Sequence, residues 1–245
     1  MARLPNTPQP IQVAVYSAYG RLVRQGGPSE YAGAIARCGV DSFVTLAGSG
    51  TGTYEEKRSA FLGFAFPVST QDEAAGRLAT LRSAHFDARH VAHAFRLVDG
   101  AARFSDDGEP SGTAGKPLLT ALTGKYISNG MVVVVRYFGG TLLGTGGLTR
   151  AYGAAAAAAL DDAGFLTLHR ACRLRICCDY ALFDQLSARL TAMGLPAQNP
   201  QYGAEVTAEI LVKSAETAAL CASLTEWSRG QITPQVLGEE FFSFS

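Results

Sequence analysis

Residues 104–117 hold the densest group of side chains that could carry out chemistry. This segment, FSDDGEPSGTAGKP, combines three carboxylates, three glycines and a lysine. Its carboxylates could bind Mg²⁺, which prefers oxygen ligands, or act as acid and base groups. The backbone N–H groups of residues 111–115 could form an anion-binding nest beside the lysine. The candidate residues are Asp106, Asp107, Glu109, Ser111, Gly112, Thr113 and Lys116.

A nucleotide-binding P-loop is excluded at this segment. The pattern G-x-x-x-x-G-K-[ST] fits Gly115 and Lys116, but it needs glycine where Pro110 stands and serine or threonine where Pro117 stands. Aspartate and glycine also favour tight turns, so a purely structural loop is the alternative interpretation.

A second candidate site lies between a β-branched run and an alanine-rich run. Residues 131–138 predict a buried strand that contains Arg136 and Tyr137, and residues 148–163 predict a helix. The free N–H groups and the dipole of that helix would attract phosphate or carboxylate, with Arg136 and Arg150 as further donors. The glycines of the intervening loop are Gly139, Gly140, Gly144, Gly146 and Gly147.

Of two other interpretations of this loop, one is excluded and one remains open. The dinucleotide-binding fingerprint does not fit, because Thr149 stands where the third glycine is required. Glycines also allow a helix and a strand to pack closely, and the alanines of residues 154–159 favour such packing. The sequence supports close packing and an anion site equally.

Histidine and cysteine residues give no catalytic or metal-binding pattern. His90 and His93 fall at a predicted strand, where residues three apart point to opposite faces, so we expect them not to share a metal. The five cysteines include no C-x-x-C pair. We expect no metal and no cofactor, and reduced, mostly buried thiols.

The pattern of apolar residues predicts an α+β protein with two domains. Strands are expected at residues 61–68 and 91–98, with a helix after Thr70, whose capping box includes Glu73, and another from Pro117 to about residue 122. Strands at 169–178, 204–212 and 231–237, with helices at 180–193 and 215–229, make a ferredoxin-like β-α-β-β-α-β unit if residues 196–202 supply the third element. The expected domains are 42–163 and 164–245. Residues 1–41 are expected to be either a flexible extension or residues upstream of the true start, and residues 13–16 could form a short strand.

Charge and composition restrict the class of protein. The 245 residues contain 21 Lys and Arg against 21 Asp and Glu, a balance that excludes a strongly polybasic nucleic-acid or membrane binder. The balance is uneven, because residues 53–160 carry a net charge of +2 and residues 161–245 a net charge of −4. No signal peptide or membrane-spanning run is evident, so we expect a cytoplasmic protein that does not contact membranes.

Three segments resemble the IMPACT family, of the bacterial YigZ type. They are residues 87–90 (DARH), residues 104–117 and residues 132–153 (VVVVRYFGGTLLGTGGLTRAYG), supported by residues 56–61 and 227–230. The resemblance covers about residues 44–240. It implies a first domain like domain 2 of ribosomal protein S5 and a second, ferredoxin-like domain like the last domain of elongation factor G. For bacterial members of the family, the resemblance implies no particular reaction.

The resemblance favours a translation-associated factor that binds RNA or a ribosomal partner. Besides the loop residues named above, Lys57, Arg58, Arg89 and His90 would contribute to its binding surface. One alternative is an enzyme that acts on a phosphorylated or carboxylated small molecule. In that case residues 104–117, which we call the acidic segment, would hold a metal or act as acid and base. The other is a regulator that binds only proteins. The sequence does not indicate the oligomeric state.

Overall fold

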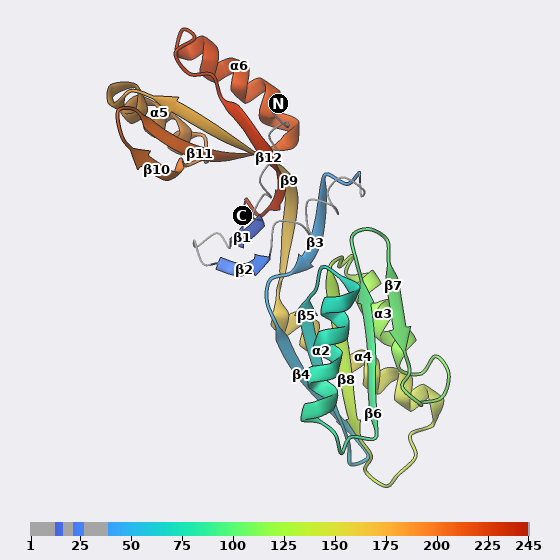
Figure 1. Ribbon diagram of the computed structural model, residues 1–245. Coiled ribbons are helices and arrows are strands. Elements are labelled where there is room, and N and C mark those ends of the chain that lie inside the picture. Colours follow the sequence, from blue (N-terminus) through green and yellow to red (C-terminus); the bar gives the residue numbers. More distant parts are fainter. Residues whose placement is uncertain (1–12, 17–21, 27–38, 245) are drawn as a thin grey trace, which may run out of the picture. The chain divides into compact units, whose positions relative to one another are not determined.

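The computed structural model describes residues 13–16, 22–26 and 39–244 (Figure 1). These residues form two compact units, a larger one at Phe43–Leu168 and a smaller one at His169–Phe244 that also includes the described residues before Phe43. The expected strand at Val13–Tyr16 is present as β1 and pairs with β2 (Leu22–Gly26). Residues 1–12, 17–21 and 27–38 of the expected flexible extension lie outside the described residues.

The larger unit is built on a five-stranded antiparallel sheet with strand order β4-β5-β8-β6-β7. The strands are β4 (Gly50–Glu56), β5 (Ser59–Pro67), β6 (His90–Arg96), β7 (Ala102–Ser105) and β8 (Gly130–Tyr137). The central strand β8 is buried along nearly its whole length, as its continuous β-branched run predicts. A further strand, β3 (Ser42–Leu46), pairs with β9.

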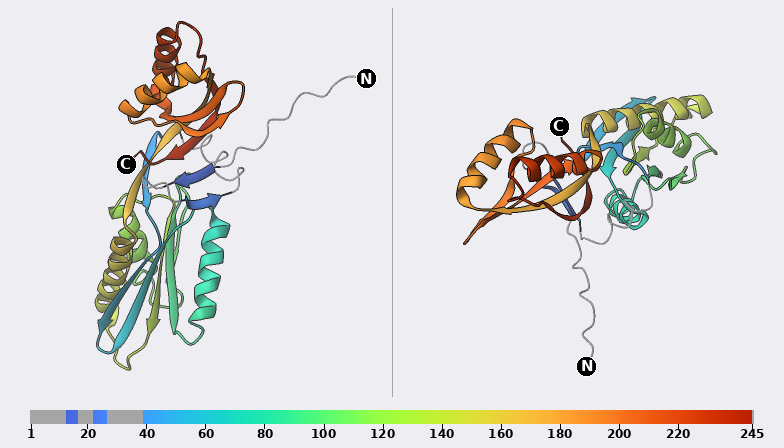
Figure 2. Two further views of the ribbon diagram at one scale, coloured as in Figure 1. Left: turned by 90° about the vertical axis from the view of Figure 1, so that its left-hand side faces the viewer. Right: turned by 90° about the horizontal axis from the view of Figure 1, so that it is seen from above.

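Helices cover both faces of this sheet, as Figure 2 shows. Helix α2 (Gln71–Ala84) packs on one face, while α3 (Gly115–Gly124) and α4 (Gly144–Ala163) pack on the other. The predicted cap of α2 is confirmed, since the Glu73 N–H donates to the Thr70 hydroxyl over 3.1 Å. The Glu73 carboxylate reaches back one residue further than expected, to Ser69.

The alanine run of α4 packs directly against glycines of β4 and β5. A Cβ atom at Gly63 would lie 2.4 Å from the carbonyl oxygen of Ala155, and one at Gly52 would lie 2.5 Å from the backbone nitrogen of Ala159. Only glycine leaves room for this approach of helix to sheet. The expected close packing therefore exists, but its glycines belong to the strands and not to the loop at residues 139–147.

Strand β9 (Phe165–Cys178) runs from the larger unit into the smaller one. In the smaller unit it is followed by α5 (Tyr180–Ala192), β10 (Gln198–Tyr202), β11 (Val206–Lys213), α6 (Thr217–Trp227) and β12 (Gln235–Phe242), with a short 3₁₀ helix at Ser214–Glu216. The sheet is antiparallel with the order β10-β11-β9-β12, and α5 and α6 pack on one of its faces. This is the ferredoxin-like arrangement that the pattern predicted. The last strand begins at Gln235, four residues later than expected.

The two units confirm the expected α+β class. Among the residues described, no helix has the length and apolar character needed to cross a membrane.

Candidate functional site

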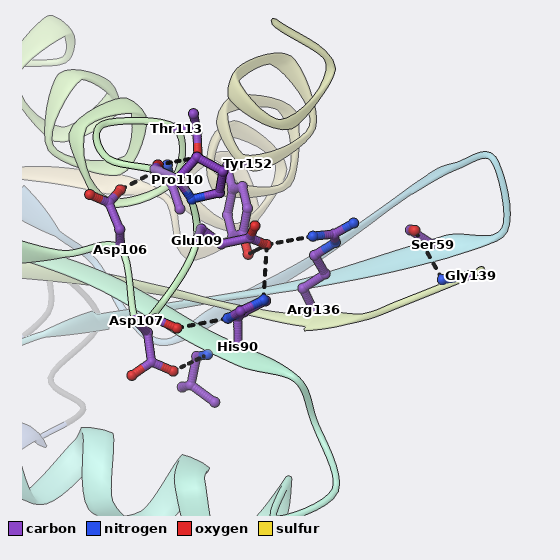
Figure 3. Close-up of polar contacts among 12 residues, drawn as sticks. Ser59, His90, Asp106, Asp107, Glu109, Pro110, Thr113, Arg136, Gly139 and Tyr152 are labelled. Atoms are coloured by element: carbon purple, nitrogen blue, oxygen red, sulfur yellow. Dashed lines mark hydrogen bonds and ion pairs between the residues drawn. The ribbon is translucent and has the colours of Figure 1, made fainter. Parts of the chain in front are cut away.

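A buried glutamate joins three of the sequence motifs in the larger unit (Figure 3). The Oε1 atom of Glu109 accepts hydrogen bonds from Arg136 over 2.6 Å and from the Tyr152 hydroxyl over 2.8 Å. All three side chains are almost inaccessible to water. Burial and the adjacent carboxylate raise the pKa of Tyr152 far above its ordinary value, so its hydroxyl remains protonated and donates. Glu109 thereby holds the acidic segment, β8 and α4 together.

His90 lies beside this cluster, at the start of β6. Its Nδ1 atom is 2.7 Å from the carbonyl oxygen of Asp107 and must donate, because a carbonyl oxygen can only accept. Its Nε2 atom faces Glu109 Oε1 at 3.8 Å. The Asp107 carboxylate binds the N–H of Val91 over 2.7 Å and pairs with Arg82 of α2. These contacts fix the acidic segment against the edge of the sheet.

The predicted anion nest is occupied by a carboxylate of the chain itself. Asp106 accepts hydrogen bonds from the backbone N–H groups of Gly112, Ala114 and Gly115 over 2.8 to 3.0 Å. Desolvation acts to raise the pKa of Asp106, but these three hydrogen bonds outweigh it and hold the pKa below its ordinary value. Asp106 therefore caps the start of α3, and the nest is closed to an external phosphate.

The three acidic side chains thus point to separate partners and do not converge on one point. Within residues 39–244, no group of three or more His, Cys, Asp or Glu side chains is arranged to hold a metal ion. His90 shares the face of β6 that carries Ala92 and Ala94, while His93 lies on the opposite face. Burial lowers the pKa of His93.

The turn between β4 and β5 brings Lys57 and Arg58 to one end of the larger unit. Both residues have positive φ, 48° and 64°, as a two-residue type I′ turn requires, although neither is the glycine or asparagine that such turns favour. A Cβ atom at Gly139 would lie 2.1 Å from the Arg58 carbonyl carbon, so Gly139 allows the loop after β8 to touch the turn. The Gly139 N–H also donates to the buried Ser59 hydroxyl over 3.1 Å.

Exposed apolar side chains and basic side chains lie at the same end of the unit as this turn. The guanidinium groups of Arg89 and Arg136 lie 5.8 and 5.5 Å from the centroid of the Phe138 ring, which is 42% exposed. Phe86 and Leu142 are more exposed still, at 86% and 83%. The register of β8 with β5 and β6 places all of these segments at the same end of the sheet, the lower end of the larger unit in Figure 1. We call residues 57–58, 86–89 and 138–150 the basic loop end.

Helix α4 begins at this end. It starts at Gly144, four residues earlier than predicted, because the glycines at 144, 146 and 147 form its first turn and do not precede it. No side chain caps this first turn. A Cβ atom at Gly146 would lie 3.7 Å from the Arg150 guanidinium, and one at Gly147 would lie 4.0 Å from the Glu56 carboxylate. Uncapped N–H groups, the Arg150 cation and the Glu56 carboxylate are thus close together here.

Most of the predicted site residues lie in or near these two regions, but not all of them. Tyr137 points to the α2 face, where its hydroxyl donates to Asp87 and contacts His85. Burial and the neighbouring Asp87 raise its pKa. Arg136 is 4% exposed and already paired, so it is not a surface donor. Ser111 and Lys116 are exposed near the start of α3, whereas Thr113 is buried and its hydroxyl donates to the Pro110 carbonyl.

Tyr152, Ser59 and Arg82 were not predicted from the sequence as functional residues. Tyr152 had a recognisable signal, since it is the one hydroxyl-bearing side chain on an otherwise apolar face of α4, and a buried tyrosine hydroxyl needs a partner. Ser59 and Arg82 meet their partners across 80 and 25 residues of sequence, and no local pattern indicates such pairs.

Comparison with known proteins agrees with the motifs. Residues 57–160 match the Impact N-terminal domain, and residues 176–231 match a domain of unknown function, DUF1949. The chain is 36% identical to IMPACT family member YigZ of Escherichia coli strain K12 over 202 residues, which is 79% of this chain and 97% of that protein.

Two further relatives support the match. The chain is 31% identical to IMPACT family member YvyE of Bacillus subtilis strain 168, over 78% of this chain and 88% of that protein. A solved structure described as the crystal structure of a hypothetical protein is 33% identical, with a TM-score of 0.54, over 82% of this chain and 98% of that one. The chain belongs to the IMPACT family.

Proposed function

We propose that the protein is a cytoplasmic, translation-associated factor whose larger unit binds RNA through the basic loop end. The observation that carries this proposal is the gathering of exposed cations and exposed apolar rings around the uncapped first turn of α4. Phosphate groups are attracted to such a turn and to arginine and lysine. Unpaired bases stack on aromatic rings and on guanidinium planes.

The direction of the acidic side chains supports the same proposal. Asp107 and Glu109 are paired with Arg82 and Arg136 and so add little net negative charge to the basic loop end, while the Asp106 carboxylate is held by backbone N–H groups at the start of α3. The cations that are exposed there are Lys57, Arg58, Arg89 and Arg150. The charge excess of this region is small, so RNA binding here would depend on a local contact and on stacking more than on a broad electrostatic field.

Arg136 has a different role in this proposal from the phosphate contact expected at first. Its guanidinium is held by Glu109 and packs against the rings of Phe61 and Phe138. It therefore positions Phe138 from inside the unit. The small-molecule enzyme has less support, since the anion nest that it would use is filled by Asp106.

The test separates the charge of the basic loop end from its fold. The variant Lys57→Asn with Arg58→Gly removes two cations and supplies the residues that a type I′ turn prefers, and Arg150→Ala removes a third. Binding of single-stranded RNA and co-sedimentation with ribosomes are measured at several salt concentrations. We expect the slope of log affinity against log salt to become shallower by about 0.7 for each phosphate group that the variant no longer neutralises.

Arg103→Ala is the matched control. Arg103 is exposed on β7 and pairs in register with Phe95, away from the basic loop end. It should change neither the affinity nor the slope. Equal losses in the control and in the loop-end variants, or no RNA and ribosome binding by the original chain, would contradict the proposal.

A further inference from the structure

A pair of stacked, exposed tyrosines marks the surface of the smaller unit. The rings of Tyr180, at the start of α5, and Tyr202, at the end of β10, lie 6.2 Å apart with 25° between their planes. They are 50% and 65% exposed. The Tyr180 hydroxyl donates to the Gly203 carbonyl over 2.8 Å, and Tyr202 packs edge-on against Phe183. These contacts hold both rings in place while leaving ring surface open to a partner.

Carboxylates flank this pair. Asp184 follows Tyr180 by four residues and is exposed, so it shares the same side of α5. Glu205 is exposed in the turn after β10, and its carboxylate accepts a hydrogen bond from the Cys177 thiol over 3.2 Å. Residues 176–212 contain no lysine and a single arginine, Arg189. We call Tyr180, Asp184, Tyr202 and Glu205 the acidic tyrosine edge.

The backbone of this edge is poorly suited to pairing with another strand. β10 is the outermost strand of its sheet, but its pairing with β11 is irregular between Gln198 and Gln201, and Pro200 within it has no N–H. Proline and bulges at an edge strand oppose the addition of a further strand. Recognition at this edge would therefore depend on its side chains.

We propose that the acidic tyrosine edge is a docking surface for an arginine-rich protein segment. Guanidinium groups stack on tyrosine rings and form paired hydrogen bonds with carboxylates, and this edge presents both. The local excess of negative charge favours a cationic partner and opposes RNA. This inference is independent of the RNA-binding proposal, because it rests on different residues in the other unit.

The experiment uses the full chain and a fluorescein-labelled peptide of alternating arginine and glycine. Fluorescence anisotropy should show binding, and Tyr180→Leu with Tyr202→Leu should weaken it about fivefold or more. A peptide with lysine in place of arginine has the same charge but stacks less well, so the tyrosine substitutions should affect it less. Tyr180→Phe with Tyr202→Phe keeps both rings and should preserve binding, while Trp227 fluorescence confirms that each variant is folded.

A charge-matched control separates this edge from general acidity. Asp184→Asn with Glu205→Gln should weaken binding of the arginine peptide, whereas Glu216→Gln with Glu226→Gln, which removes two exposed carboxylates at α6, should not. Equal losses from the two pairs would overturn the proposal, and so would unchanged binding by the leucine variants. Self-association of the chain that the leucine variants abolish would also overturn it, because the occupant would then be a second copy. Binding of an RNA oligonucleotide at this edge would contradict it as well.

Discussion

The two units bind their charged side chains internally in different ways. In the larger unit the carboxylates of Asp106, Asp107 and Glu109 are bound by the chain's own donors, and the exposed charges at the basic loop end are mainly cations. In the smaller unit the bound charges are pairs of arginine and glutamate. Arg173 pairs with Glu209 over 3.0 Å and with Glu240 over 2.6 Å, and Arg175 and Arg170 each have a glutamate partner at 3.9 Å.

The opposite signs of the two units follow from the uneven residue count, +2 in residues 53–160 and −4 in residues 161–245. Which individual charges remain exposed depends on which side chains the fold pairs. Loss of a buried ion pair lowers the free energy of unfolding far more than loss of an exposed one. Substitutions in the two units should therefore differ in their effect on stability.

The largest effect is expected at the buried glutamate of the larger unit. Glu109→Gln leaves the Arg136 guanidinium buried without a counter-charge, which should lower the free energy of unfolding by about 3–5 kcal/mol. Urea denaturation followed by far-UV circular dichroism measures this change. Glu239→Gln removes the partly exposed partner of Arg170 in the smaller unit and should cost less than about 1 kcal/mol. Similar losses for the two variants would show that the units do not differ in this way.

A smaller effect is expected from adding one methyl group between α4 and the sheet. Gly63→Ala places a Cβ atom 2.4 Å from a backbone oxygen of α4, and such overpacking should cost about 1–3 kcal/mol. Trp227, the only tryptophan, lies in the smaller unit, so its fluorescence should change less than the circular dichroism of the whole chain. As a control, a Cβ atom at Gly76 of α2 meets nothing within 4 Å, and Gly76→Ala should stabilise by about 0.5–1 kcal/mol.

Acid should affect the two units in opposite directions. The pKa of Asp106 is lowered in the folded chain, so its stabilising contribution is present above pH 3.8 and is lost as the pH falls below that value. Burial raises the pKa of Glu240 despite the adjacent Arg173, so the smaller unit should lose stability as the pH rises above 4.5 and through the raised pKa.

Unfolding followed between pH 3 and 7 tests this contrast, with Trp227 fluorescence reporting on the smaller unit. Asp106→Asn should lower the free energy of unfolding by about 1 kcal/mol at neutral pH, as loss of a helix cap does, and by less in acid. Glu240→Gln should flatten the pH dependence of the Trp227 transition above pH 4.5. A Trp227 transition that already lacks this dependence in the original chain would refute the Glu240 argument.

The smallest effect is expected at the turn of the basic loop end. Lys57→Asn with Arg58→Gly relieves two side chains of positive φ and should raise the free energy of unfolding by about 0.5–1 kcal/mol, while weakening RNA binding. Thermal unfolding measures the first effect. An exchange of Glu55 and Glu56 for glutamine on the same hairpin leaves the turn unchanged and should produce no such gain.

The sequence predicted elements whose residues alternate or repeat clearly, such as β8, α2 with its Thr70 cap, and the helices of the smaller unit. It did not predict β4, because the glycines at 50 and 52 resemble a loop until the helix that packs on them is known. For the same reason it began α4 at Leu148, the first large buried residue, and assigned the glycines before it to a loop.

The candidate site was predicted in composition but not in geometry. The chemistry-bearing segments are the ones that meet at Glu109, yet the roles differ from those expected. Asp106 fills the nest that it was expected to border, and Arg136 is buried where a surface cation was expected. Such roles depend on which donor and acceptor groups the fold brings together from positions tens of residues apart. The spacing of residues along the chain does not indicate these contacts.

The contact between β4 and α4 also determines when the larger unit can form during synthesis. The Thr51 N–H donates to the Asp162 carboxylate over 2.8 Å, across 111 positions of the chain. At ordinary rates of translation, roughly 5 to 20 seconds separate the appearance of these two residues. Until α4 is made, Phe61 and Ala65 on the inner face of β5 have no helix to cover them. The apolar face of the first strands therefore remains exposed to chaperones or to other chains until α4 is made. This helix is nearly the last element of the unit to be synthesised.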